Sequence, residues 1–307
     1  MVSNQYLVAY SGGVDSHVLL HQLVQAGDAS FLVIHVNHGL DPKADFWQQH
    51  CADICESLAV PFKAVRINVI KKPRHSLEAI ARELRYQVFA EFLTPGAVLV
   101  TGHNQNDQAE TVLLQLMRGA GVKGLSGMPF EKPFAAGVHR RPLLTWSRNE
   151  IEAYAREHQL CWIDDPSNAR NDFDRNFLRN TIIPELAVRR EGVVANIARS
   201  AKHLATTAEL LDELALIDYQ VVQGTENACL SIPAIKTLSD MRQSNVLRYW
   251  LGLLRVQLPS EAIMYQIKKQ LLHSCPSAVP EVRWGKVVLH RCSSDQQQLR
   301  CIRLGDT

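Results

Sequence analysis

Short apolar runs separated by helix-like stretches dominate the first half of the chain. Residues 6–10, 31–36 and 97–101 are mostly apolar, and each run has the length of a strand that is buried on both faces of a sheet. The stretch after the first run has an apolar stripe at helical spacing, and Gly27 is placed to end that helix. The stripe consists of Val18, Leu19, Leu20, Leu23 and Val24. This alternation predicts an α/β domain built on a doubly wound parallel sheet.

A second pattern begins near Pro184, where the alternation of strands and helices stops. Before it, Ser147 and Glu150 have the spacing of a capping box and predict the start of a helix. Residues 193–216 have the spacing of one long amphipathic helix, which we expect to link two parts of the chain. The candidate buried positions of this helix are Ile197, Leu204, Leu210, Leu211 and Leu214.

The last third of the chain has a weaker pattern. Residues 232–254 indicate more helix, while residues 282–289 and 299–304 indicate two short strands that pair as a hairpin. We therefore expect two domains, a larger one at 1–190 and a smaller, mainly helical one at 191–307 that begins with the linking helix.

Composition narrows the class of protein but not its partner. A chain of 307 residues is long enough for two domains of roughly 100–200 residues each. Its net charge of +2 neither requires nor excludes a nucleic-acid partner. The seven cysteines form no C-x-x-C pair, and Cys51 and Cys55 are better interpreted as buried side chains than as metal ligands. With no secretory leader and no bilayer-length apolar stretch in the sequence, we expect a reduced, cytoplasmic protein.

The segment between the first strand and the first helix carries the strongest chemical signal. Residues 11–16 read Ser-Gly-Gly-Val-Asp-Ser. Two glycines admit the close approach of an anion, and the following helix start offers unpaired N–H groups, so this order of elements builds a phosphate site. A carboxylate at Asp15 fits such a site if it meets a magnesium ion carried by the phosphates. The loop is neither a Walker A motif nor a dinucleotide fingerprint, and an ordinary Gly-Gly turn is the alternative.

The second buried run also ends in polar residues. It contains His35 and leads directly into Asn37 and His38. Ligands of open α/β sheets bind outside the carboxyl ends of the strands, so both histidines are expected near the place of a nucleotide base. A histidine that makes only a local hydrogen bond is an equal expectation for each.

A third polar cluster follows the run 97–101. It contains His103, Asp107 and Glu110. If Asp107 lies in a helix, it shares one face with Glu110, and both carboxylates can address one ligand or one cation. The alternative is that Asp107 is the N-cap of that helix and Glu110 completes a capping box.

Several other polar segments are ambiguous when taken singly. Glu78, Arg82 and Arg85 lie within one or two helical turns, where surface ion pairs are common. The glycine-rich residues 118–128 fit either a phosphate-contacting loop or a helix end followed by turns. The sequence of residues 164–168 predicts an acidic turn.

Arginines gather between the two predicted domains. Arg175 and Arg179 lie one helical turn apart, a spacing suited to phosphate recognition. They belong to a larger group of cations that consists of Arg140, Arg141, Arg148, Arg175, Arg179, Arg189, Arg190, Arg199 and Lys202. Such a stripe can follow the phosphates of a nucleic acid, although an ordinary solvated surface is almost equally expected.

The motifs together resemble those of the PP-loop ATP pyrophosphatases and, more closely, those of the tRNA(Ile)-lysidine synthetase family. The resemblance covers residues 6 to about 186 and rests on the segments SGGVDS, HVNHGL, EAIARELRY, DQAET, RGAGVKGLSGM, RPLL, DDPSN and RNFLR, in this order. It implies an ATP-binding catalytic domain at 1–190 and a linker helix with a small tRNA-binding domain at 191–307. It further implies a ligase that uses ATP to adenylate the C2 oxygen of the wobble cytidine in tRNA(Ile) with a CAU anticodon. Free lysine then displaces AMP to form lysidine.

The resemblance also implies roles for individual residues. The implied catalytic residues are Asp15, His103, Asp107, Glu110 and Arg85. The implied ATP contacts are Ser11, Gly12, Gly13, Val14, Asp15, Ser16, His35, Asn37, His38, Arg82, Arg175 and Arg179. The implied magnesium ligands are Asp15, Asp107 and Glu110. Within this set His103 would stabilise charge on the adenylating phosphate, and Glu110 would either orient the lysine amine or bind magnesium.

The chain departs from the family pattern at two positions. It has Asn104 and Asn106 where the family usually has a second histidine and a second aspartate. Loss of a negative charge at position 106 is expected to weaken the hold on magnesium. The chain also ends before the β-rich C-terminal domain that many members carry, and the frequent dimers of the family imply a homodimer here.

Two alternatives to a lysine ligase follow from these departures and from the wider family. One is a tRNA-binding relative that has lost catalysis through the changes at Asn104 and Asn106. The other is a PP-loop enzyme with a different tRNA modification, such as thiolation. The second alternative is weaker, because the matching loops contain no cysteine.

Overall fold

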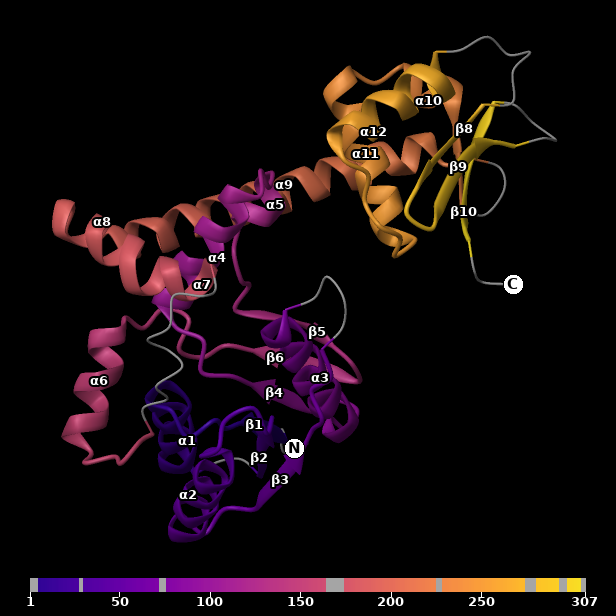
Figure 1. Cartoon of the computed structure of the whole chain (residues 1–307). Coiled ribbons are helices and arrows are strands. Elements are labelled where there is room, and N and C mark those ends of the chain that lie inside the picture. Colours follow the sequence, from indigo (N-terminus) through magenta and orange to yellow (C-terminus); the bar gives the residue numbers. More distant parts are fainter. Residues whose placement is uncertain are drawn as a thin grey trace. The chain divides into compact units, whose positions relative to one another are not determined.

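The computed structural model describes residues 5–27, 30–71, 76–163, 174–224, 228–273, 280–292 and 297–304. The chain forms two compact units, residues 1–205 and residues 206–307 (Figure 1). The division falls inside helix α9 (Val193–Val222). The functional division at 190/191 stays a prediction.

Unit 1 is built on a six-stranded sheet with the order β3-β2-β1-β4-β6-β5. Its strands are β1 (Tyr6–Ala9), β2 (Phe31–Asn37), β3 (Phe62–Arg66), β4 (Val98–Val100), β5 (Glu131–Phe134) and β6 (Gly137–Arg140). All neighbours are parallel except β5, which runs antiparallel to β6. The predicted parallel α/β sheet is therefore confirmed. The strands β3, β5 and β6 were not recognised in the sequence, because they are short and mostly half-buried or exposed.

Helices cover both faces of this sheet (Figure 1). On one face α1, α2 and α6 pack around Val8, Leu19 and Cys51, and on the other α3 packs against Leu7 through Phe89. The helices of unit 1 are α1 (Val14–Ala26), α2 (Ala44–Ser57), α3 (Leu77–Phe92), α4 (Gln105–Met117), α5 (Val122–Leu125), α6 (Arg148–Glu157), α7 (Asp174–Phe177), a π-helical turn (Leu178–Ile182) and α8 (Ile183–Arg189). Cys51 and Cys55 are fully buried in this core, as the sequence predicted.

Helix α9 buries small side chains that the hydrophobic pattern did not select. Ala201, Ala208, Ala215 and Val222 recur every seven residues and are at most 9% exposed. The predicted burial of Leu210 is wrong, since this side chain is 59% exposed. The other predicted positions of this helix are partly buried. Although α9 is 30 residues long, neither it nor another helix in the described part of the chain is long and apolar enough to cross a membrane.

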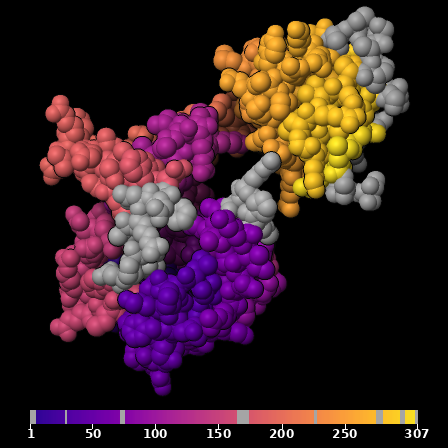
Figure 2. Space-filling view, in the orientation of Figure 1, coloured from indigo at the N-terminus to yellow at the C-terminus, as the bar shows by residue number. Residues whose placement is uncertain are grey.

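Unit 2 combines helices with a small antiparallel sheet of order β7-β10-β9-β8. Its elements are β7 (Cys229–Ser231), α10 (Ile232–Lys236), α11 (Asp240–Leu253), α12 (Glu261–Ile267), a π-helical turn (Lys268–Leu272), β8 (Glu281–Trp284), β9 (Val287–Arg291) and β10 (Gln298–Arg303). The helices and the sheet share a core around Trp250, Leu247 and Leu289. In Figure 2 the described atoms of this unit, coloured orange to yellow, form one closely packed body.

Two predictions for this unit need correction. The run 282–289 is not one strand but two, because the chain turns at residues 285–286 and β8 pairs with β9. The run 299–304 does pair with this region, as strand β10 against β9. The helical run 232–254 is divided into α10 and α11 by residues 237–239.

Candidate functional site

The candidate site lies where the carboxyl ends of β1 and β4 meet. The strand order reverses between these two neighbours, since β2 and β3 lie on one side and β6 and β5 on the other. A crevice at such a reversal is the usual ligand site of an open α/β sheet. The loop 11–13 leaves β1 toward α1, and residues 101–104 leave β4 toward α4. The sheet thus brings together two segments that are about ninety residues apart in the sequence.

The loop after β1 has a shape that its own hydroxyl groups fix. The Oγ of Ser16 donates to the carbonyl of Gly13 at 2.9 Å and lies 3.1 Å from the Oγ of Ser11. Gly12 has a φ of +86°, and a Cβ there would lie 2.9 Å from the Sγ of Cys51. Glycine is therefore required at this position, and the loop is shaped before an anion arrives.

The N-terminus of α1 is open toward this loop. Its N-cap residue, Gly13, has no side chain that could accept from the first N–H groups, and Val14 is buried as the first helical residue. Unpaired N–H groups at a helix start bind phosphate oxygens well. This geometry supports the predicted phosphate site.

Asp15 joins the two segments. Its Oδ1 accepts from Nδ2 of Asn104 at 2.9 Å, and its Oδ2 accepts from Nη1 of Arg148 at 3.0 Å. A Cβ at Gly102 would lie 2.9 Å from the backbone carbonyl of Asp15, so the two segments touch through their backbones. Burial raises the pKa of Asp15, and the nearby Arg148 opposes that rise.

Asn104 begins α4 and explains one departure from the family pattern. Its Oδ1 accepts from the N–H groups of Asn106 at 2.9 Å and Asp107 at 3.1 Å, while a carboxylate oxygen of Asp107 accepts from the Asn104 N–H at 3.0 Å. The capping box therefore pairs Asn104 with Asp107, and the alternative in which Asp107 is the N-cap and Glu110 its partner is wrong. The amide of Asn104 caps the helix with its oxygen and holds Asp15 with its nitrogen.

Two carboxylates and two arginines form a compact network beside α4. Glu110 accepts from Nε of Arg175 at 2.7 Å and from Nε of Arg179 at 2.6 Å. Asp107 Oδ1 accepts from Nη2 of Arg175 at 2.9 Å and from Nη2 of Arg179 at 3.0 Å. Burial works against the ionised form of Asp107, but the cations nearby, Arg175 first, outweigh it and lower the pKa of this carboxyl. The predicted pairing of carboxylates on one helix face is confirmed, and their partners in this structure are cations of the chain itself.

This network bears on the predicted magnesium ligands. Within the described residues no three His, Cys, Asp or Glu side chains are grouped as a metal site would require. Asp15 is held by an amide and an arginine, and both Asp107 and Glu110 are neutralised by two arginines. As arranged, these three carboxylates do not form a site in which the protein itself would hold a magnesium ion in addition to one carried by ATP.

Polar side chains behind β4 include Thr101 and His139, to which the sequence assigned no role, and Arg141, which it placed in the group of cations. Thr101 Oγ1 lies 2.6 Å from Nδ1 of His103 and 2.9 Å from Nε2 of His139. Arg141 Nη2 lies 3.2 Å from Nδ1 of His139. Burial lowers the pKa of both histidines to about 3. His139 was missed because strand β6 was missed, and its polarity within a short strand was the signal available.

At the end of β2, His35 and Asn37 make hydrogen bonds within the chain, whereas a ring nitrogen of His38 has no partner among the described residues. His35 Nδ1 donates to the carbonyl of Tyr10 at 3.0 Å, and Asn37 Nδ2 donates to Asp45 at 2.9 Å. His38 Nδ1 is buried without a hydrogen-bond partner in the described part of the chain. Of the predicted base-side residues, His38 thus has a buried ring nitrogen without a partner among the described residues.

Two arginines of α3 remain without an acidic partner among the described residues. The guanidinium carbons of Arg82 and Arg85 lie 5.1 Å and 5.9 Å from the centre of the Tyr86 ring. The ion pair expected between Glu78 and Arg82 on the surface of α3 is not formed in the described part of the chain. Burial lowers the pKa of Arg85, and the nearby Arg82 adds to that effect. These cations are suited to an anionic substrate.

The predicted stripe of cations loses several members to internal ion pairs. Arg140 pairs with Glu131 at 2.6 Å, and Arg148, Arg175 and Arg179 pair with site carboxylates. A continuous phosphate-binding stripe therefore does not follow from these arginines.

The other two ambiguous segments have different outcomes. In the glycine-rich segment, Gln108 of α4 accepts from the N–H of Met128 at 2.7 Å and donates to its carbonyl at 3.0 Å, which favours a structural turn. The acidic turn at 164–168 lies outside the described residues.

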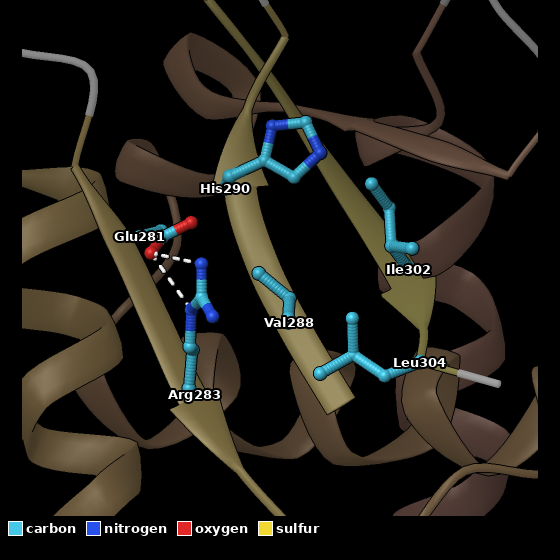
Figure 3. A pocket seen from close by; sticks show the side chains of 6 residues that line it. All are labelled: Glu281, Arg283, Val288, His290, Ile302 and Leu304. Carbon is cyan, nitrogen blue, oxygen red and sulfur yellow. Dashed lines mark hydrogen bonds and ion pairs between the residues drawn. The ribbon is translucent and has the colours of Figure 1, made fainter. Parts of the chain in front are cut away.

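Unit 2 has a hollow on its small sheet (Figure 3). It is lined by Glu281, Arg283, Val288, His290, Ile302 and Leu304, on strands β8, β9 and β10 and the residue after them. Arg283 pairs with Glu281 there at 2.6 Å, and two aliphatic side chains lie opposite. This hollow has no phosphate loop and no group of carboxylates and histidines comparable to those of unit 1.

Acid should destabilise unit 1 through its buried histidines. Burial lowers the pKa of His17 and His38 to about 4 and that of His103 and His139 to about 3. Because the unfolded chain binds these protons near pH 6.5, stability is fully present above that pH and is lost as the pH falls toward 4. The raised pKa of Asp15 opposes part of this loss. We expect the melting temperature of this unit to fall by about 10 °C between pH 7.5 and pH 4.5, measured by circular dichroism at constant ionic strength. A constant melting temperature over this range would contradict the expectation.

Comparison with known proteins identifies both halves of the sequence. The profile described as a PP-loop domain matches residues 1–186, and the profile described as the TilS substrate binding domain matches residues 230–299. The tRNA(Ile)-lysidine synthase of Coxiella burnetii is 41% identical over 292 residues, which are 94% of this chain and 65% of that protein. That of Salmonella choleraesuis is 40% identical over 296 residues, which are 95% of this chain and 68% of that protein. The chain thus spans about two thirds of the length of these curated relatives.

Among solved structures, the U34-tRNA thiolase NcsA from Methanococcus maripaludis with its 4Fe-4S cluster is similar in fold. The TM-score is 0.52 at 19% sequence identity, and the match covers 66% of this chain and 72% of that one. At this identity the likeness concerns the fold alone.

Proposed function

This chain belongs to the tRNA(Ile)-lysidine synthase family, and we propose that it joins free lysine to C2 of the wobble cytidine in tRNA(Ile) with a CAU anticodon, using ATP. The observation that carries the proposal is the loop 11–16, which is preshaped at the open start of α1 and tied to α4 by the contact of Asp15 with Asn104. Such a loop suits the pyrophosphate end of ATP.

The proposed reaction has two steps. The C2 oxygen of the cytidine attacks the α-phosphorus of ATP, and the bond from that phosphorus to pyrophosphate breaks. The lysine amine then attacks C2, AMP leaves, and the amine loses a proton. Charge on the phosphate oxygens grows in the first step, so positioned donors stabilise its transition state. Arg82 and Arg85 have the charge for this task, and neither forms an ion pair among the described residues, although Glu78 lies near enough to act on Arg85.

The network around Glu110 changes the role expected for this residue. Its carboxylate is fully buried, and both oxygens accept from arginines. A base must reach the proton that it removes, and these oxygens are already occupied. We propose that Glu110 and Asp107 hold Arg175 and Arg179 in place beside the nucleotide.

Magnesium enters this proposal with ATP as part of the substrate. Asp15 is the carboxylate within the loop 11–16, and its negative charge suits an ion carried by the phosphates. No step of the reaction is assigned to an ion held by Asp107 or Glu110. Cytoplasmic location and a homodimer belong to the same proposal, by analogy with the family.

The test uses the chain as it stands, with ATP, magnesium, labelled lysine and a tRNA(Ile) transcript that has a CAU anticodon. We expect labelled tRNA and one pyrophosphate per lysine transferred. Binding of tRNA without release of pyrophosphate would contradict the proposed enzyme and support the alternative of a tRNA-binding relative that has lost catalysis. Omission of lysine serves as the control for the adenylation step alone.

The change Asn106→Asp tests whether the second departure from the family limits turnover. The Oδ1 of Asn106 accepts from the N–H of Arg148 at 3.3 Å, and a carboxylate oxygen can make the same contact. A negative charge in the first turn of α4 also suits the helix dipole, so stability should change by less than about 0.5 kcal/mol. We expect the magnesium concentration for half-maximal pyrophosphate release to fall by about threefold. An unchanged requirement would mean that magnesium does not approach α4.

A further inference from the structure

A chain of polar contacts leads from Arg141 to His103. Arg141 Nη2 lies 3.2 Å from His139 Nδ1. Nε2 of the same imidazole lies 2.9 Å from the hydroxyl of Thr101, and this hydroxyl lies 2.6 Å from Nδ1 of His103. Thr101, His139 and Arg141 are 6%, 0% and 3% exposed. Water therefore competes little for these contacts.

Arg141 determines the direction of the hydrogen bonds. A guanidinium group has donors and no acceptor, so Nδ1 of His139 has to accept. The proton of His139 is then on Nε2, and this N–H donates to the hydroxyl of Thr101. Arg141 is itself held, because its Nη1 donates to the carbonyl of Pro129 at 2.6 Å.

The hydroxyl of Thr101, in turn, determines which nitrogen of His103 accepts a hydrogen bond. A buried hydroxyl needs an acceptor for its own proton. Nδ1 of His103 is its acceptor in the described part of the chain, since the other partner of Thr101 Oγ1 is the donating N–H of His139. Nδ1 of His103 is therefore unprotonated, and the ring proton is on Nε2.

We propose that Thr101, His139 and Arg141 are positioning residues that hold His103 in the Nε2–H tautomer, which makes His103 a hydrogen-bond donor to an anionic phosphate oxygen and not a base. Nε2 of His103 has no hydrogen-bond partner among the described residues. The charged neighbours of the ring include Asp107, Arg82 and Arg175, so it lies within the candidate site. The identity of the anion as ATP rests on the proposed function, whereas the tautomer does not.

The charge state of the ring agrees with this role. Burial, with the cations Arg141 and Arg82 nearby, lowers the pKa of His103 to about 3. A neutral ring has one N–H to donate, and the contacts from Arg141 through His139 and Thr101 determine which nitrogen carries the proton.

Nuclear magnetic resonance of protein labelled with 15N at histidine tests the tautomer directly. Long-range 1H–15N correlations distinguish a protonated Nε2 from a protonated Nδ1, and the variant His103→Gln assigns the signals by their absence. In the unmodified protein we expect His103 with its proton on Nε2. Thr101→Ser keeps the hydroxyl and should keep this pattern, while Thr101→Val removes the hydroxyl and should give a mixture of tautomers.

Kinetics separate positioning from a merely structural role. Thr101→Val should lower kcat for pyrophosphate release by about tenfold and leave KM for ATP within about twofold, and Thr101→Ser should restore kcat. If Thr101→Val does not fold, His139→Gln is the second variant, because its amide can accept from Arg141 and donate to Thr101 and should keep the Nε2–H tautomer.

Two results would overturn the proposal. One is a protonated Nδ1 of His103 in the unmodified protein, and the other is the same pure tautomer in Thr101→Val as in Thr101→Ser. Failure of the proposed function is distinguishable, because an Nε2–H tautomer without lysine transfer would count against the lysine ligase alone.

Discussion

Replacement of Asp15 by alanine is expected to abolish ATP-dependent pyrophosphate release, with a loss of at least about 100-fold, while the protein stays folded. Asp15 links the phosphate loop to the start of α4 through Asn104 and holds Arg148 at 3.0 Å. Without it the two halves of the site lose their shared contact. The measurement is pyrophosphate release with tRNA(Ile) at saturating ATP.

The stability of this variant should change much less than its activity. Burial raises the pKa of Asp15, so the folded chain gains little from the ionised form of this side chain. We expect a loss in unfolding free energy of less than about 2 kcal/mol. Glu152→Gln is the matched control, since it removes another partner of Arg148, at 2.8 Å, and should keep activity within about threefold. Equal losses of activity in both variants would refute a special role for Asp15.

The second large effect is expected from Glu110→Gln, which should destabilise unit 1 by about 3–5 kcal/mol. Glu110 is fully buried, and Arg175 and Arg179 both donate to it through Nε and reach Asp107 through Nη2. Removal of its charge leaves Arg175 and Arg179, which are 24% and 38% exposed, with one carboxylate between them. Urea denaturation followed by circular dichroism measures the change.

A surface ion pair provides the control for this effect. Glu131 pairs with Arg140 at 2.6 Å, but both side chains are about a third exposed or more. Glu131→Gln should therefore cost less than about 1 kcal/mol. The double variant Glu110→Gln with Arg179→Gln should recover part of the loss, because one unpaired charge is removed. A loss below about 1 kcal/mol for Glu110→Gln alone would mean that the network does not stabilise the fold.

The sequence predicted those strands of unit 1 that are buried on both faces of the sheet. The runs at β1, β2 and β4 are nearly continuous apolar segments, and the sheet places these three strands at its centre. The strands β3, β5 and β6 lie toward the edges and alternate or expose their side chains, so their sequences are not distinct from loops. The hydrophobic pattern of α9 did not predict its buried alanines, because a small side chain that allows close helix packing has little hydrophobicity of its own.

The sequence by itself determined the chemistry at the loop 11–16, because glycine at a left-handed position and an uncapped helix start are local requirements. It also placed Asp107 and Glu110 on one face, since helical spacing is local too. Only the tertiary structure decided what those carboxylates contact. Arg175 and Arg179 come from 65 to 72 residues further along the chain, and His139 reaches His103 through Thr101 from a neighbouring strand. Contacts of this kind depend on strand order and burial, and neither is encoded in the spacing of residues within one segment.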